Sequence, residues 1–526
     1  MDFSTKNSEK CFIAEVFSRI LITSVLTISP VNDVWVRIDC DDAISHELSD
    51  YFCFDVPGAH WMPAAKKGWD RKIRLFKLRT HTLYRGLIPR LLEFAAQRDY
   101  MVNNQVPGPN PLWPGSFMDD ELATMQLPFP LRDYQYAALR AMLNQERGIV
   151  LSPTGSGKSY VVYLLAMLLS DAKILIVVPT LGLVQQMVGD FASYGYTENI
   201  HTIQGGTAKA TRTRVTVSTW QSIYELPASY FDQFGCVIVD EVHLAKSKSI
   251  AGVMEKCVSV PFRFGFTGTL DNMQCHRLIL EGLFGTVTRV ATTNELVKAK
   301  HLTPPRVIVC VLEYPEAVRK QLRRCEYVEE IDFLVGSGPR NKFLALLCRE
   351  QKFNTLLLFQ LVAKHGAALY ARVKQTLDKY RPVWYIDGNT PAGEREAIRR
   401  EMSGDTDAVL LASYGTTQLG VNIPNLRCLI LAHPSKSLIR VLQSIGRILR
   451  LHEGKTNATI YDIVDDLRIG KYVNHTFKHA EARMAYYAAE KFPVTLKKIP
   501  LEMFAQTMAE TTHNALKTTN AQKGGA

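Results

Sequence analysis

The sequence lacks the cysteine spacings that mark zinc sites and secreted disulfide frameworks. Its 10 cysteines are scattered over 526 residues, and no two of them form a Cys-x-x-Cys pair. Scattered cysteines are typical of a reducing compartment, so we expect a cytoplasmic protein. Internal repeats and long low-complexity tracts are also missing from the sequence, which argues against solenoid and fibrous folds.

Long hydrophobic runs are scarce as well. The most apolar stretch, residues 11–29, is interrupted by Glu15 and Arg19, and it contains no obvious small-residue cleavage site. A membrane-spanning helix needs about 20 apolar residues, and a signal peptide needs such a cleavage site. We therefore expect this stretch to form a core-packing helix or strand, and we expect no membrane association.

Acidic residues are scarce between positions 61 and 90. This stretch has nine Lys or Arg and one acid, Asp70, within a chain of net charge +11. A local excess of positive charge favours a polyanionic partner. Cations bind phosphates and aromatic rings stack on bases, so the interleaved candidates for nucleic-acid contact are Lys66, Lys67, Trp69, Arg71 and Lys72. The alternative is a solvated face over core tryptophans.

A glycine-rich loop, Ser152–Ser159, lies between the apolar runs 148–151 and 160–169. This order predicts a strand, a phosphate-binding loop and a helix. In such a loop backbone N–H groups converge on an anion, a lysine reaches the terminal phosphates and a hydroxyl binds Mg²⁺. The residues in these roles are Thr154, Gly155, Ser156, Gly157, Lys158 and Ser159. Ser152 replaces the usual first glycine, and the alternative is a turn that only looks like a phosphate-binding loop.

Apolar strands are predicted after this loop over 172–178, 215–218 and 235–239. Strands that alternate with helices indicate a doubly wound α/β domain, whose ligands bind at the carboxyl edge of the sheet. Asp240 follows the last of these strands, where a carboxylate holds the Mg²⁺ that bridges nucleotide phosphates. Glu241 beside it is placed to orient and deprotonate the attacking water.

A second α/β domain is predicted from the buried-type strands 355–359 and 408–412. Beyond them, Gln443, Arg447 and Arg450 are spaced to share one helical face. Two arginines aimed at a transferring phosphoryl group would act as arginine fingers, and the alternative is a surface helix with ordinary charge spacing. Upstream of the loop, Gln135 has the donor and acceptor that adenine recognition requires, although such a residue is often polar surface.

The chain resembles superfamily 2 helicases with two RecA-like lobes in the order of its motifs. These are Gln135, SPTGSGKS (152–159), VVPT (177–180), STWQ (218–221), DEVH (240–243), TGT (267–269), SYGTTQLGVN (413–422) and QSIGRILR (443–450). The N-terminal segments VRIDC (36–40), HELSDYFCF (46–54) and GWDRKIRL (68–75) are similar to those of the UvsW-type bacteriophage recombination helicases.

The resemblance implies an ATP-dependent DNA helicase or translocase that unwinds or branch-migrates forks, Holliday junctions, D-loops and R-loops in recombination, replication and repair. It implies ATP and Mg²⁺ as cofactors, with ATP between the lobes, and DNA or RNA–DNA hybrids as partners. It also implies a monomer or weak oligomer in the host cytoplasm, with replication and recombination proteins as further partners. The residues that it places near nucleic acid or nucleotide are Pro179, Thr180, Thr219, Trp220, Ser413, Tyr414, Gly420 and Asn422.

The length predicts about three domains of usual size. We expect an N-terminal extension (1–30), a small α/β domain (31–105), a linker (106–125), a first RecA-like lobe (126–295), a second lobe (296–470) and a C-terminal helical segment with a tail (471–526).

Three alternatives remain open at this point. An RNA helicase has the same lobes, and the motor subunit of a restriction-type complex would need a partner chain because no nuclease motif is evident. A non-catalytic clamp would require a degraded nucleotide site, against which Lys158, Asp240, Glu241 and Arg450 argue.

Overall fold

The computed structural model describes residues 25–56, 69–108, 115–205, 209–244, 248–270, 274–377, 381–404, 407–418, 423–435 and 437–504. The predicted site residues Lys66, Lys67, Gly420 and Asn422 lie outside these ranges, as does the C-terminal tail. The described chain divides into two compact units. One contains the residues up to 151 and 159–290, and the other contains 152–158 and the residues from 291 onward.

The N-terminal domain is a small α/β unit. Its elements are β1 (Val25–Pro30), β2 (Trp35–Asp39), α2 (Asp42–Tyr51), β3 (Cys53–Asp55), β4 (Lys72–Arg74), β5 (Thr82–Tyr84), the turn η3 (Arg85–Leu87), α3 (Ile88–Ala96) and β6 (Met101–Asn104). The main sheet has the order β5-β2-β1-β6, and β3 pairs with β4 separately. Because β1 is an inner strand, residues 25–30 belong to this domain, whereas the sequence pattern assigns them to an extension.

The first lobe is a doubly wound domain around a seven-stranded sheet. Its elements are α4 (Gly115–Thr124), α5 (Asp133–Gln145), β7 (Arg147–Leu151), α6 (Lys158–Leu168), β8 (Ile174–Val178), α7 (Leu181–Ser193), β9 (His201–Ile203), β10 (Val215–Thr219), α8 (Trp220–Ile223), α9 (Ala228–Phe231), β11 (Cys236–Asp240), η4 (Val242–Leu244), α10 (Lys248–Lys256), β12 (Phe262–Thr267), α11 (Gln274–Phe284) and β13 (Val287–Arg289). The strand order is β13-β7-β12-β11-β8-β10-β9, and all neighbours are parallel.

The second half of the predicted linker is part of this lobe. Helix α4 occupies residues that the sequence pattern assigns to a linker, and its side chains Met118 and Leu122 are buried in the core of the lobe. The Pro- and Gly-rich composition that suggests a linker therefore describes only the residues before the helix.

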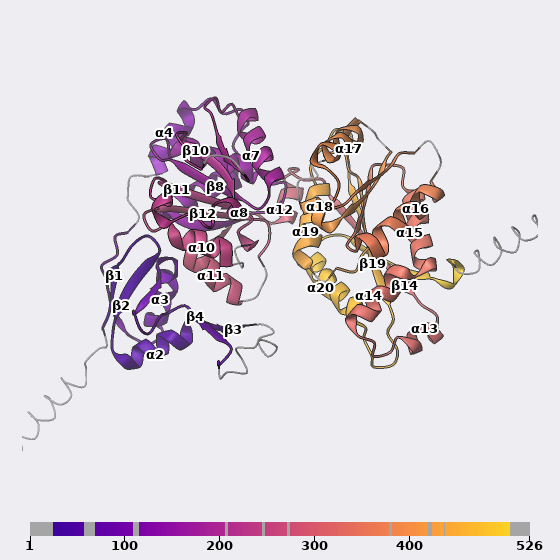
Figure 1. The fold of residues 1–526 in the computed structure, drawn as a ribbon, viewed down its shortest axis with the longest axis horizontal. Helices are drawn as coiled ribbons and strands as arrows, with labels where there is room; N and C mark the ends of the chain where they lie inside the picture. Colours follow the sequence, from indigo (N-terminus) through magenta and orange to yellow (C-terminus); the bar gives the residue numbers. More distant parts are fainter. Residues whose placement is uncertain are drawn as a thin grey trace, which may run out of the picture. The chain divides into compact units, whose positions relative to one another are not determined.

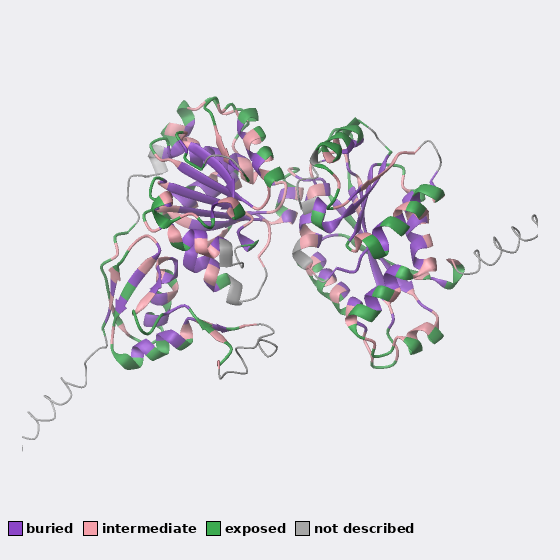
Figure 2. Ribbon diagram, viewed as in Figure 1, coloured by how far each residue is buried: buried purple, intermediate pink, exposed green. Residues whose placement is uncertain are grey.

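The second lobe repeats the architecture of the first. Its elements are α12 (Thr293–Lys298), β14 (Pro305–Glu313), α13 (Glu316–Gln321), α14 (Tyr327–Gly336), α15 (Gly338–Glu350), β15 (Thr355–Phe359), η5 (Val362–Gly366), α16 (Ala367–Thr376), β16 (Val383–Ile386), α17 (Ala392–Gly404), β17 (Val409–Ser413), α18 (Tyr414–Gln418), β18 (Cys428–Leu431), α19 (Leu438–Ile448), β19 (Ala458–Asp466), α20 (His475–Ala489) and β20 (Val494–Pro500). The parallel order is β16-β17-β15-β18-β19-β14-β20. Figure 1 shows the elements, and Figure 2 shows that the strands of both large sheets are mostly buried.

Residues 471–500 belong to the second lobe and do not form a separate segment. Strand β20 pairs with β14 along its whole length. In α20, Arg483 forms an ion pair with Asp462 of β19 at 2.8 Å, and both side chains are almost completely buried. The sequence leaves open whether this region packs on the lobe or contacts nucleic acid, and the described part packs on the lobe.

The N-terminal domain and the first lobe are joined by one hydrophobic core and by polar contacts. Within the N-terminal domain Arg85 Nη1 lies 2.6 Å from Asp33 Oδ1, and across the joint Arg147 Nη1 of the first lobe donates to the Asp33 carbonyl oxygen at 3.1 Å. Tyr84 donates to Glu255 at 2.5 Å. Gly86 permits the contact with α11, because a Cβ there would lie 2.1 Å from the carbonyl oxygen of Glu281. The small domain is thus a fixed part of the first unit.

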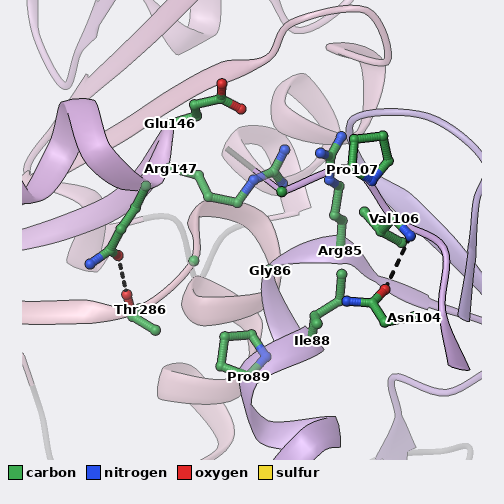
Figure 3. A pocket seen from close by; sticks show the side chains of 13 residues that line it. Arg85, Gly86, Ile88, Pro89, Asn104, Val106, Pro107, Glu146, Arg147 and Thr286 are labelled. Atoms are coloured by element: carbon green, nitrogen blue, oxygen red, sulfur yellow. Dashed lines mark hydrogen bonds between the residues drawn. The ribbon is translucent and has the colours of Figure 1, made fainter. Parts of the chain in front are cut away.

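A cavity of about 320 Å³ lies at this joint. Figure 3 shows Arg85 and Arg147 along its wall, with Asn104 and Val106 from the N-terminal domain and Thr286 from the first lobe. Both arginines are already engaged by Asp33. None of the residues predicted to bind nucleotide lines this cavity, which belongs to the joint between the two domains.

Candidate nucleotide and nucleic-acid sites

The glycine-rich loop lies where the sequence predicts it, between β7 and α6. Gly155 and Gly157 have φ values of 88° and 82°, a left-handed conformation that only glycine adopts without strain. Helix α6 begins at Lys158, and Lys158 Nζ donates to the carbonyl oxygens of Ser152 and Pro153, both at 3.2 Å. The loop thus has the backbone turn and the lysine that phosphate binding requires.

The acidic pair lies at the carboxyl end of β11. Asp240 is the last residue of the strand, and its Oδ1 accepts a hydrogen bond from Glu241 N at 2.9 Å. Glu241 has a φ of 54°, which is uncommon for a residue with a side chain. The backbone therefore turns sharply at the strand end, and the two adjacent carboxylates are held in a fixed relation.

The position of these groups in the sheet follows from its topology. Strand β12 lies between β7 and β11, and all three are parallel. Neighbouring strands are about 4.8 Å apart, so the carboxyl ends of β7 and β11 are roughly 10 Å apart on one edge. This spacing brings Ser159, which follows the loop, and Asp240 to the same edge of the sheet.

A chain of close polar contacts leads from Glu241 to the end of β12. Glu241 Oε2 lies 3.2 Å from His243 Nδ1, which is 2.9 Å from Thr267 Oγ1. Thr267 Oγ1 in turn donates to the carbonyl oxygen of Thr269 at 2.9 Å. His243 and Thr267 are both buried. The two motifs DEVH and TGT are therefore connected directly, a link that their separate positions in the sequence do not reveal.

Gln135 and Ser159 are both engaged in the first lobe. Gln135 is 4% exposed and forms a capping box at the start of α5, where its Oε1 accepts from Arg132 N at 3.1 Å. Ser159 Oγ lies 3.0 Å from Tyr194 OH. Gln135 thus stabilises the start of α5, and its role in adenine recognition stays a prediction.

In the second lobe, α19 carries the predicted glutamine and arginines. Gln443 is 9% exposed, and Arg447 and Arg450 are half-buried. Gln443 and Arg447 lie within the helix as the spacing predicts, whereas Arg450 lies just beyond its C-cap, Leu449, and so is not on a shared helical face. The described residues thus confirm the helix, and the catalytic roles of these side chains stay predictions.

The predicted nucleic-acid residues of the first lobe lie at strand ends and are largely engaged in local structure. Thr180 caps α7, with its Oγ1 accepting from Leu183 N at 3.4 Å. The carbonyl oxygen of Pro179 accepts from Gln221 Nε2 at 3.4 Å. Thr219 is buried, and Trp220 is half-buried beside the core. These contacts join the VVPT and STWQ segments to each other.

Two further candidates, Ser413 and Tyr414, follow β17. Ser413 Oγ lies 3.0 Å from Thr416 Oγ1, and the Tyr414 ring is 1% exposed. Burial raises the pKa of the Tyr414 phenol above its usual value. The Tyr414 ring is therefore not exposed to a nucleic acid. A nucleic-acid contact of this segment, which stays a prediction, would have to use atoms other than this ring.

The described part of the basic stretch is on the N-terminal domain. Arg71 is exposed with a φ of 66°, and Trp69 Nε1 donates to the carbonyl oxygen of Lys72 at 3.0 Å. Farther along, Lys77 Nζ lies 3.8 Å from the centre of the Trp35 ring. Lys77 therefore lies against a partly buried aromatic ring, whereas Arg74 of β4 is paired with Asp70 and Asp50.

The donors available for a metal are few. Within the described ranges, no group of three or more His, Cys, Asp or Glu side chains could hold a metal ion. Mg²⁺ does not require such a group, because it usually binds one or two protein oxygens together with phosphates and water. The hydroxyl of Ser159 and the carboxylate of Asp240 are oxygen donors of this kind. No described helix is both long and apolar enough to cross a membrane.

Three protein-family models match the chain. Residues 31–104 match "DNA helicase UvsW, N-terminal", residues 128–272 match "Type III restriction enzyme, res subunit", and residues 339–452 match "Helicase conserved C-terminal domain". A curated relative, the ATP-dependent DNA helicase uvsW of Enterobacteria phage T4, is 32% identical over 496 residues, which cover 89% of this chain and 98% of the relative. The chain belongs to the UvsW family of helicases.

Other relatives and solved structures are also similar to the chain. The DNA 3'-5' translocase XPB2 of Sulfurisphaera tokodaii is 25% identical over 371 residues, covering 62% of this chain and 81% of the relative. The solved structure of T4 UvsW covers 90% of this chain and 99% of its own, with 30% identity and a TM-score of 0.47. The structure of a fragment of a putative HsdR subunit of a type I restriction enzyme from Vibrio vulnificus covers 73% of this chain and 71% of its own, with a TM-score of 0.54 and 19% identity. The two proteins share the same fold.

As a UvsW-type helicase, the chain is an ATP hydrolase with two RecA-like lobes, which confirms the predicted class. The sequence contains the DEVH and TGT motifs, but it does not reveal that His243 connects them. It also gives no sign of Lys455 and Thr303, which contact the end of α19. No local pattern marks these two residues, because Thr303 lies far from α19 in the sequence and Lys455 follows the helix in an irregular segment.

Proposed function

We propose that this UvsW-family helicase uses ATP hydrolysis to unwind or branch-migrate branched DNA such as forks, Holliday junctions, D-loops and R-loops. The observation that carries the proposal is the glycine-rich loop after β7 on the same sheet edge as the acidic pair after β11. The likeness to a phage protein named as an ATP-dependent DNA helicase supports DNA as the substrate.

In the proposed mechanism each residue has one role. The loop amides and Lys158 bind the β- and γ-phosphates of ATP, with Ser159 and Asp240 as ligands of Mg²⁺, which neutralises phosphate charge when bound. Glu241 orients the attacking water and takes its proton. Arg447 and Arg450 stabilise the charge of the phosphoryl group during transfer, as arginine fingers do.

The contacts from Glu241 through His243 to Thr267 suggest how hydrolysis acts beyond the nucleotide. A shift of the Glu241 carboxylate changes its 3.2 Å approach to His243 Nδ1, and His243 is hydrogen-bonded to Thr267 at the end of β12. We propose that this connection reports the nucleotide state to the strand ends that contact nucleic acid. Those contacts are expected to be mainly to the DNA backbone, so the preference is for structure and not for sequence.

Two substitutions test the nucleotide site. Lys158→Ala and Glu241→Gln should each lower the kcat of DNA-stimulated ATP hydrolysis, by about 10²-fold or more where the general base is lost. Both side chains are partly exposed at a loop or strand end, so the far-ultraviolet circular dichroism and Tm should match the wild type. Normal turnover in either variant would contradict the assignment.

A further inference from the structure

The C-terminal turn of α19 carries both candidate arginine fingers, and its carbonyl groups are held from outside the helix. An α-helix leaves its last four C=O groups without intrahelical partners. Helix α19 ends at Ile448, with Leu449 as its C-cap. The carbonyl oxygens of residues 448, 449 and 450 all accept hydrogen bonds, and the donors come from Thr303 and Lys455.

Lys455 makes two of these four bonds and a third to a neighbouring loop. Its Nζ donates to the carbonyl oxygens of Ile448 at 2.5 Å, Arg450 at 2.9 Å and Pro424 at 3.1 Å. An ammonium group has three N–H donors, so these three acceptors use all of them. Pro424 precedes β18 and Lys455 precedes β19, two strands that pair with each other. The ammonium therefore ties the end of α19 to the amino ends of two core strands.

Thr303 holds the same turn through two further bonds. Its backbone N–H donates to the carbonyl oxygen of Leu449 at 2.7 Å, and its hydroxyl donates to that of Arg450 at 3.1 Å. Thr303 is completely buried, and Lys455 is 8% exposed. A positive charge at a helix C-terminus is favourable, and charge-assisted hydrogen bonds are stronger than neutral ones. The turn is thus fixed in one arrangement.

Burying the charged form of Lys455 costs free energy. Burial, with the positive charges of Arg427 and Arg450, lowers the pKa of Lys455 to about 7. An apolar side chain of similar length would avoid this cost if packing were its only task. Lys455 is also too deeply buried to contact a nucleotide or DNA directly. Its contribution must therefore pass through the backbone that it binds.

We propose that Lys455 is a positioning residue for ATP hydrolysis, which fixes the C-terminal turn of α19 so that Arg450 keeps the orientation in which it acts. The inference rests on the proposed role of Arg450. A misplacement of about 1 Å can lower the rate of a positioned reaction by about 10²-fold. The effect of losing Lys455 should therefore appear in kcat.

The first measurement compares Lys455→Met with a matched control. In Lys455→Met, which keeps the length but loses the donors, kcat for DNA-stimulated ATP hydrolysis should fall by about 10²-fold, while KM for ATP changes by less than about threefold. The control is Lys364→Met in the same lobe, where the exposed lysine pairs with Asp332 at 2.7 Å. Its kcat should equal that of the wild type, and an unchanged kcat in Lys455→Met would overturn the proposal.

A double-mutant cycle separates positioning from general stability. In an Arg450→Ala background, Lys455→Met should lower kcat by no more than about twofold further, because the group that it positions is already gone. A full multiplicative loss would overturn the inference. Wild-type kcat in Arg450→Ala would instead overturn the proposed arginine role. Loss in Arg450→Ala with none in Lys455→Met would overturn the positioning inference alone.

A milder variant keeps the test open if Lys455→Met does not fold. Thr303→Val removes the hydroxyl donor to the Arg450 carbonyl but keeps the backbone bond to Leu449. It should lower kcat less than Lys455→Met would, and again without further loss in the Arg450→Ala background. Equal losses in both backgrounds would contradict positioning, and Tm values would show that each variant is folded at the assay temperature.

Discussion

At the scale of single residues, the backbone conformation of Glu241 fixes the position of its carboxylate. Its left-handed conformation, with φ of 54°, costs of order 1–3 kcal/mol for a residue with a side chain. The hydrogen bond from Glu241 N to Asp240 and the contact with His243 hold it there. The strain is thus located at the residue that we propose as the general base, where a fixed carboxylate orientation matters most.

Two buried histidines in the second lobe predict how stability depends on pH. Burial, and then the charge of Arg340, lower the pKa of His365 to about 3 and of His433 to about 4. In the unfolded chain both have a pKa near 6.5. Above that value they are neutral in both states. As pH falls below it, only the unfolded state takes up protons, and stability is lost at up to about 1.4 kcal/mol per pH unit for each histidine.

The test measures the urea midpoint for unfolding of the second lobe at several pH values between 7 and 5.5. Most carboxyl groups titrate below this range. The wild-type midpoint should fall with pH across this range, and His433→Gln should show a shallower fall because one titrating group is gone. An identical pH dependence in wild type and variant would contradict the assignment of this slope to His433.

At the scale of elements, β4 and the residues beside it carry the described part of the basic stretch, in which Arg74 is paired with Asp70 and Asp50. Reversing Arg71 and Lys72 to Glu should weaken binding to branched DNA and reduce the slope of log K against log salt by about 0.9 for each DNA phosphate that the variant no longer neutralises. The control is the reversal of Lys497 and Lys498 on the exposed edge strand β20, which changes the net charge equally. Equal effects from both pairs would show that only net charge matters.

Sequence patterns predict the elements whose residues are contiguous. The glycine-rich loop lies between two apolar runs, and Asp240 directly follows a buried strand, so local order is enough to find both. Strand β20 escapes such a prediction, because VTLKKIP carries two lysines and is exposed along most of its length at a sheet edge. Helix α4 resembles linker in the sequence because its neighbours are rich in Pro and Gly.

Contacts between distant segments cannot be predicted in the same way. Lys455 binds carbonyl groups at positions 424, 448 and 450, and no spacing rule connects these positions. The burial of Tyr414 depends on packing beside Arg483 and Asp462, whose charges act on its phenol. The residue types of the motifs are therefore predictable, whereas the side chains that support them require the folded structure.

At the scale of the whole molecule, the chain combines two RecA-like lobes with a small α/β domain that is attached to the first lobe. The joint through Asp33, Arg85 and Arg147 makes the N-terminal domain a fixed part of the first unit. The described part of its basic stretch therefore moves with the first lobe.

The most direct test compares DNA structures of equal length and sequence composition. ATPase stimulation and strand separation should be measured with linear duplex, fork, four-way junction and R-loop DNA, and with an RNA duplex, using wild type and Lys158→Ala. The account predicts that branched DNA stimulates hydrolysis more than linear duplex does, and that wild type alone converts the four-way junction to duplex products in the presence of ATP. Equal stimulation by linear duplex, or stimulation by RNA alone, would contradict it.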